Sequence, residues 1–112
     1  MDVNRARELL AIERQRVEQL LEESLEAAHE DRDTVNEAVD VAEPSERFTA
    51  EQADDALVER LRERLDAIER AEGRLRAGTF GRSVRSGAPI PDERLEADPA
   101  AELTRDEAAG RP

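Results

Sequence analysis

The sequence predicts an all-α protein, in which an antiparallel two-helix coiled-coil hairpin precedes a small, metal-free C-terminal module with short helices. Two observations lead to this fold class. Charged residues make up 41% of the 112 residues and aromatic residues only 2%, so large apolar side chains are too few for a deep globular core. The apolar residues that are present are mostly Leu, Ala, Val and Ile at helical spacing, which is typical of long helices and coiled coils.

The first helix is expected to run from about residue 2 to residue 30. Asp2 can serve as its N-cap. Apolar side chains then recur at intervals of three and four residues, which places them on one face of a helix. This stripe consists of Val3, Ala6, Leu10, Val17, Leu20 and Ala27, is interrupted by Glu13 and Ser24, and is widened by Leu9, Leu21 and Leu25. The pattern predicts an amphipathic face rather than a strict leucine zipper.

The second helix is expected over residues 49–77. Phe48 can occupy the position before the cap, Thr49 the N-cap and Gln52 the third helical position, which completes a capping box. Gly78 is a suitable C-terminal stop. The apolar stripe of this helix comprises Val58, Leu61, Leu65, Ile68 and Leu75, with Glu72 within it. The two helices should pair antiparallel, because each alone would leave its apolar face in water.

Residues 31–48 form the predicted tip of the hairpin. The segment is polar, and Pro44 and Ser45 should break a helix that reaches them. It is long for a helix–helix connection. We therefore expect part of the segment to extend a helix and part of it to form a functional loop.

The formal net charge of -12 argues against nucleic acid as a direct ligand, because binding to phosphates requires a basic face. It favours a basic partner surface or a basic channel. The alternative is that the acidity only keeps the chain soluble. The chain has no signal peptide, lipidation motif or 18-residue apolar run, so we expect a cytoplasmic protein that does not act at a membrane.

An enzymatic function is not expected. The sequence contains one histidine, no cysteine, tyrosine or tryptophan, and no glycine-rich phosphate-binding loop. Carboxylate pairs are frequent, but no pattern places two of them in a dry pocket, where their pKa values would shift. The sequence therefore predicts no catalytic residue and no cofactor.

Residues 79–107 are rich in turn-forming residues and are expected to form the C-terminal module, followed by a frayed tail over 108–112. A short helix is predicted over 91–97 with proline at its first position. Asp98 and the proline after it resemble a second helix start, and Thr104 with Glu107 a capping box. We expect an apolar cluster to hold the module together, comprising Phe80, Ile90, Leu95 and Leu103.

Four positions in this module have the spacing of metal ligands. Ser83 and Ser86 are three residues apart, seventeen residues follow, and Thr104 and Glu107 are again three residues apart. This is the frame of a four-cysteine zinc knuckle. The surrounding stretches 74–81, 86–97 and 99–103 resemble the zinc-finger segment of the DksA/TraR family of RNA polymerase regulators, including its Gly-x-Pro-Ile-Pro and Glu-Arg-Leu-Glu-Ala sequences.

The chain departs from this family at all four ligand positions. Zinc requires thiolate, imidazole or carboxylate ligands, and serine and threonine hydroxyls bind it poorly. Only Glu107 could donate, and one carboxylate does not make a site. We therefore expect a degenerate, metal-free knuckle, either ordered by its apolar cluster or loosely ordered.

The resemblance also implies a function. Members of the family bind RNA polymerase, insert the hairpin into its secondary channel and bring an acidic tip near the active site, without binding promoter DNA. One alignment places Glu37, Asp40 and Ala42 on the tip motif, and a gapless alignment places Asp40 and Glu43 at its acidic positions. We expect a monomer whose partner is RNA polymerase. The alternative is a helical interaction or scaffold protein that no longer binds polymerase.

Overall fold

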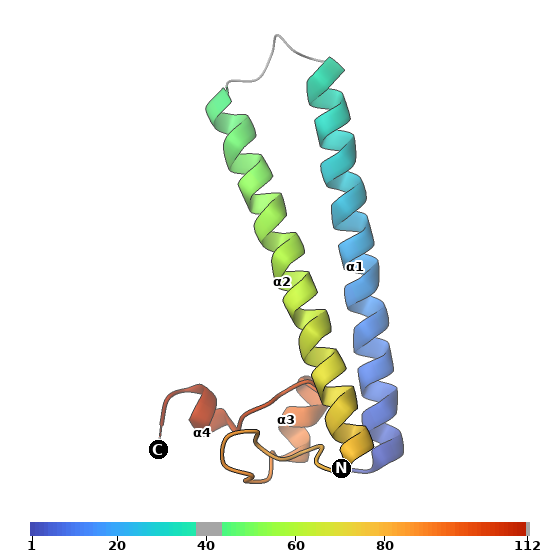
Figure 1. Cartoon of the computed structure of the whole chain (residues 1–112), viewed down its shortest axis with the longest axis vertical. Helices are drawn as coiled ribbons and strands as arrows, with labels where there is room; N and C mark the ends of the chain where they lie inside the picture. Colours follow the sequence, from blue (N-terminus) through green and yellow to red (C-terminus); the bar gives the residue numbers. More distant parts are fainter. Residues whose placement is uncertain (38–43, 112) are drawn as a thin grey trace. The chain divides into compact units, whose positions relative to one another are not determined.

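The computed structural model describes the backbone of residues 1–37 and 44–111, and the side chains of residues 1–27 and 54–111. Within these ranges the secondary structure is helical, which confirms the predicted fold class (Figure 1). The helices are α1 (Val3–Glu37), α2 (Pro44–Ala77), α3 (Asp92–Ala97) and α4 (Arg105–Ala108). An isolated antiparallel bridge joins Arg82 to Pro89 in the loop before α3.

Both long helices extend further than predicted. Helix α1 continues to Glu37 rather than ending near residue 30, and α2 begins at Pro44 rather than near residue 49. The chain contains no glycine or proline before Pro44, so nothing in the backbone stops α1 early. Proline disrupts a helix interior but suits a first turn, where its missing N–H would be unpaired anyway. Thr49 therefore lies inside α2 and does not cap it.

The described chain forms two compact units. The base unit comprises residues 1–15 and 65–112, and the arm unit comprises residues 16–64. In the base unit the start of α1 packs against the end of α2, and the side chains fully buried there include Ala6, Leu10, Ile68 and Ala71. Early residues of one helix thus contact late residues of the other, so the two helices run antiparallel in this unit.

Glu72, which interrupts the apolar stripe of α2, has a specific partner in the base unit. It forms an ion pair with Arg14 of α1. Both side chains are about one-third exposed, at 34% for Arg14 and 30% for Glu72. The interruption of the stripe is therefore a pairing position between the helices and not a defect in the pattern.

The arm unit buries less apolar surface than the predicted stripe suggests. Among its described side chains only Val17 is fully buried. Leu20 and Leu25 of α1 keep 38% and 43% of their surface exposed, and the stripe residues Val58 and Leu61 of α2 are only half-buried. Apart from Val3, which is 49% exposed, the stripe is therefore better covered in the base unit than along the described part of the arm.

The predicted helix ends in the base unit are confirmed. The backbone N–H of Arg5 donates to the Asp2 carboxylate at 3.2 Å, which caps α1. At the end of α2, Gly78 has φ 79°. The N–H of Thr79 donates to the carbonyl of Arg74 at 2.9 Å, and the N–H of Gly78 to that of Leu75 at 3.3 Å. This is a Schellman motif, which uses the left-handed backbone conformation that glycine adopts most easily.

The C-terminal module has a small apolar core made of Ile90, Leu95 and Ala101, with Phe80 and Met1 packed against it. The prediction was right for Phe80, Ile90 and Leu95. Leu103, which was also predicted, is only half-buried and lies outside this cluster. Met1 takes part because the base unit brings the start of the chain to the module.

Three local features of the module differ slightly from prediction. Helix α3 begins one residue later, with Pro91 as its N-cap. Asp98 caps a turn rather than a helix, because its carboxylate accepts from the N–H of Ala100 at 3.2 Å but no helix follows. Residues 109–111 are closed by hydrogen bonds instead of fraying, since the N–H of Arg111 donates to the carbonyl of Asp106 at 2.8 Å.

None of the helices in the described parts of the chain combines the length and the apolar character that crossing a membrane would require.

Candidate functional site

The four positions with metal-ligand spacing lie together in the module, and we call this cluster the knuckle (Ser83, Ser86, Thr104 and Glu107). The Ser83 hydroxyl, which is buried, donates to Oε2 of Glu107 at 2.9 Å. The same hydroxyl oxygen accepts from the backbone N–H groups of Arg85 at 3.1 Å and Ser86 at 3.2 Å. Ser83 thus orders its own loop and reaches the second half of the knuckle.

Thr104 and Glu107 form the second half of the knuckle as a capping box. The N–H of Glu107 donates to the Thr104 hydroxyl at 3.2 Å, and the N–H of Thr104 donates to Oε1 of Glu107 at 3.1 Å. This confirms the capping box predicted from the sequence. The Glu107 carboxylate therefore accepts from both halves of the knuckle, with one oxygen for each.

The backbone around Ser83 is folded into a tight loop. The N–H of Ser83 donates to the carbonyl of Ala88 at 2.8 Å, and that of Gly87 donates back to the carbonyl of Ser83 at 2.9 Å. Gly87 has φ 76°, a conformation that side-chain-bearing residues rarely adopt. A further hydrogen bond, from the N–H of Val84 to the carbonyl of Glu102 at 2.9 Å, ties the loop to the chain before α4.

The Glu107 carboxyl group is held in its ionised form. Burial is the largest single influence on its pKa and raises it. Hydrogen bonds from the Ser83 hydroxyl, from the hydroxyl and N–H of Thr104, and from the nearby Ser86 hydroxyl act together in the other direction. Their combined effect exceeds that of burial, so the pKa of Glu107 lies below its ordinary value.

The knuckle residues do not fit a zinc ion. Three of the four side chains are hydroxyls, which are weak zinc ligands. The Ser83 oxygen and both oxygens of Glu107 already take part in hydrogen bonds within the protein. Across the residues that the structure describes, no group of three or more His, Cys, Asp or Glu side chains is placed to hold a metal.

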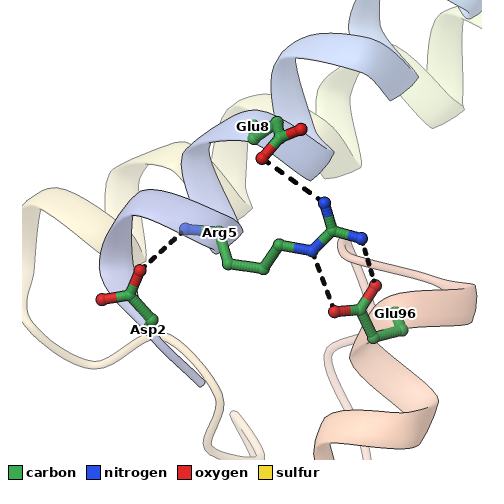
Figure 2. A network of polar contacts seen from close by, with 4 residues as sticks. All are labelled: Asp2, Arg5, Glu8 and Glu96. Atoms are coloured by element: carbon green, nitrogen blue, oxygen red, sulfur yellow. Dashed lines mark hydrogen bonds and ion pairs between the residues drawn. The ribbon is translucent and has the colours of Figure 1, made fainter.

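An ion-pair network that the sequence did not reveal attaches α3 to α1 (Figure 2). The Arg5 guanidinium donates to both carboxylate oxygens of Glu96, at 3.0 and 2.8 Å, and also lies 3.4 Å from Glu8. The Arg5 hydrogen bond is the main cause that lowers the pKa of Glu96. Because Arg5 and Glu96 are 91 residues apart, no local spacing could have predicted this pair.

A second pair attaches the module to α2. The Arg70 guanidinium donates to the Glu102 carboxylate at 2.8 Å. Each long helix therefore provides one arginine that binds a glutamate of the C-terminal module. The two pairs link the C-terminal module to α1 and α2 within the base unit.

Most of the predicted tip residues lie outside the described residues. Glu37 is the last residue of α1, and its side chain is not among those described. Asp40, Ala42 and Glu43 lie outside the described residues. Their role as a partner-binding site stays a prediction.

Comparison with known proteins gives one informative match. No family model and no curated protein matches the sequence. The solved structure of the transcription factor DksA2 from Pseudomonas aeruginosa aligns with a TM-score of 0.80 and 27% sequence identity, covering 96% of this chain and 81% of that chain. The chain therefore has a DksA/TraR-like fold, and the structural similarity extends over nearly its whole length.

Proposed function

We propose that this chain regulates transcription by binding RNA polymerase and placing the acidic end of its helical hairpin in the secondary channel of the enzyme, without direct contact with DNA. Two findings support this proposal. The fold is similar over 96% of the chain to that of a transcription factor, and the stretches 74–81 and 86–103 resemble the polymerase-binding DksA/TraR family in sequence.

The distribution of charge along the chain is the observation that most strongly supports a basic partner surface. Between Glu18 and Glu59 the chain has fifteen acidic residues and two arginines. The remaining residues have fourteen acidic residues and fifteen arginines. The arm unit as a whole, residues 16–64, has sixteen acidic residues and six arginines, so it carries ten of the twelve net negative charges. Acidity that served solubility alone would not need to be concentrated in one part of the chain.

The described side chains show that this charge is accessible to a partner. Glutamates on α1 and acidic residues on α2 in the arm unit are exposed to solvent, among them Glu22, Glu23, Glu26, Asp55 and Glu59. An exposed surface of one charge attracts a partner of opposite charge and speeds their encounter. A basic, concave protein surface, such as a channel lined by arginine and lysine, would suit this arm.

Within this proposal the tip residues make the decisive contacts. Asp40 occupies an acidic position of the family motif in either alignment. In one alignment Glu37 is the other carboxylate and Ala42 the alanine that follows, and in the other Glu43 is the other carboxylate and the motif has no alanine. Such carboxylates can pair with basic residues of a channel or alter the surroundings of a catalytic magnesium ion. The chain itself then supplies no catalytic group.

The first test is co-purification of the chain with RNA polymerase from its native host, followed by transcription in vitro. We expect Asp40→Asn to weaken the effect on initiation about threefold or more, because it removes one charged contact while keeping the side-chain shape. Asp106→Asn is the matched control, since it makes the same change on an exposed residue of α4. Helicity should be unchanged in both variants, as checked by circular dichroism.

Each negative result removes a different part of the proposal. An Asp40→Asn protein as active as the wild type would remove the tip from the mechanism. A wild-type chain that does not bind polymerase would remove the polymerase function altogether. In that case the alternative of a helical interaction or scaffold protein would stand.

A further inference from the structure

We propose that the ionised carboxylate of Glu107 closes the knuckle as an obligatory double acceptor, and that a side-chain amide of the same shape cannot replace it. This inference concerns how a knuckle without metal ligands is held together. It holds whether or not the chain binds polymerase, and its test is independent of any partner.

The first step concerns the direction of the hydrogen bond between Ser83 and Glu107. A serine hydroxyl has one hydrogen to donate and two lone pairs that accept. Both lone pairs of Ser83 are engaged, because its oxygen accepts from the N–H groups of Arg85 and Ser86. The Ser83 hydroxyl must therefore act as the donor toward Glu107, at 2.9 Å.

The second step concerns the other oxygen of the same carboxylate. Oε1 of Glu107 accepts from the backbone N–H of Thr104 at 3.1 Å, and an N–H group can only donate. Glu107 thus faces at least one donor on each oxygen. An ionised carboxylate satisfies both, whereas the amide of a glutamine offers one acceptor and would turn its NH₂ group toward one of the two donors.

The third step concerns where this link acts. Ser83 and Glu107 are 24 residues apart. Because Glu107 lies in α4, its hydrogen bond with Ser83 joins the loop around Ser83 to α4. A metal ion bound to four ligands would make the same connection. Here the connection needs neither a metal nor a thiol, so chelators and thiol oxidants should leave it intact.

The test uses the full chain and amide hydrogen exchange measured by NMR. In Glu107→Gln we expect the amides of Arg85, Ser86 and Thr104 to exchange about tenfold or more faster, because one buried donor loses its acceptor. Asp106→Asn removes the same charge from the neighbouring residue and should leave these amides as protected as in the wild type. A metal chelator should not change the wild-type rates.

A double variant distinguishes the acceptor requirement from a general loss of structure. Ser83→Ala removes the donor opposite Oε2, which frees a glutamine at position 107 to offer its single oxygen to Thr104. We therefore expect Ser83→Ala/Glu107→Gln to protect the Thr104 amide better than Glu107→Gln alone. This rescue can be measured even where Glu107→Gln greatly loosens the module.

Three results would overturn the proposal. The first is a Glu107→Gln protein whose three amides are as protected as those of Asp106→Asn. The second is the absence of rescue of the Thr104 amide in the double variant. The third is a fall in the wild-type protection when a chelator is added, which would show that a metal makes the connection.

Discussion

Glu107 combines two roles that the sequence presents separately. It is the third helical residue of the capping box begun by Thr104, and it also accepts the hydroxyl of Ser83. The first role could be predicted from local spacing alone, since capping boxes have a fixed register. The second could not, because it requires the backbone loop that turns the N–H groups of Arg85 and Ser86 toward Ser83 and so fixes the direction of its hydroxyl.

The lowered pKa of Glu107 predicts how the knuckle responds to acid. A carboxyl group whose pKa is lower in the folded than in the unfolded state adds stability that is fully present above the unfolded pKa, here near 4.5. That contribution is lost as the pH falls through the lower, folded pKa. We expect the NMR shifts of the Arg85 and Ser86 amides to stay constant at neutral pH and to move together only below the unfolded pKa.

The control for this titration is Glu107→Gln, which cannot ionise at position 107. Its Arg85 and Ser86 amides should show no coordinated shift in the same acidic range. A wild-type transition centred above the ordinary pKa of glutamate would contradict the account, because it would mean that the folded knuckle favours the protonated acid.

At the scale of the helices, the sequence predicts which segments are helical and which faces pack better than it predicts where each helix begins and ends. The stripe of α1 and α2 led to the buried residues Leu10, Val17 and Ile68, because burial follows helical periodicity. The limit at residue 30 was wrong because no glycine or proline stops α1 there. The limit at residue 49 was wrong because a proline can begin a helix as well as stop one. Ala71 was also missed, because a small side chain contributes little to a hydrophobic pattern even where helices approach closely.

Gly73 within α2 and Gly78 just after its end should respond in opposite directions to the same substitution. Gly78→Ala should destabilise the protein by about 1 kcal/mol, because alanine is strained in a left-handed backbone conformation, and Gly78 has φ 79°. Gly73→Ala should stabilise it by about 0.5–1 kcal/mol, since alanine is the better helix former. An added methyl at Gly73 would meet its nearest neighbour, Arg76, at 3.9 Å, so there is room for it.

Urea unfolding followed by circular dichroism measures both effects. The two variants differ from the wild type by the same methyl group, so each serves as the control for the other. Equal changes in the two, or a Gly78→Ala protein more stable than the wild type, would show that the Schellman motif at the end of α2 does not limit the stability of the base unit.

At the scale of the whole molecule, the sequence predicted the fold more fully than the function. The stretches around the knuckle predicted a DksA/TraR-like fold, and the structural similarity to a transcription factor of that name confirms it. The ion pairs that attach the module to the helices, such as Arg5 with Glu96, could not be predicted, because the partners are far apart in sequence. In a chain with so many charged residues, each of them also has many possible partners of opposite charge. The tip motif stays a prediction, because Asp40 and its neighbours lie outside the described residues.

The central claim is that the acidic end of the hairpin enters the secondary channel of RNA polymerase. Photo-crosslinking tests it most directly, with a benzophenone amino acid in place of Ala42 and, as a control, in place of the exposed Ala97 of the base unit. The account predicts that the probe at position 42 crosslinks to polymerase peptides that line the secondary channel, and that the probe at position 97 does not. Crosslinks from position 97 to polymerase, with none from position 42, would contradict it.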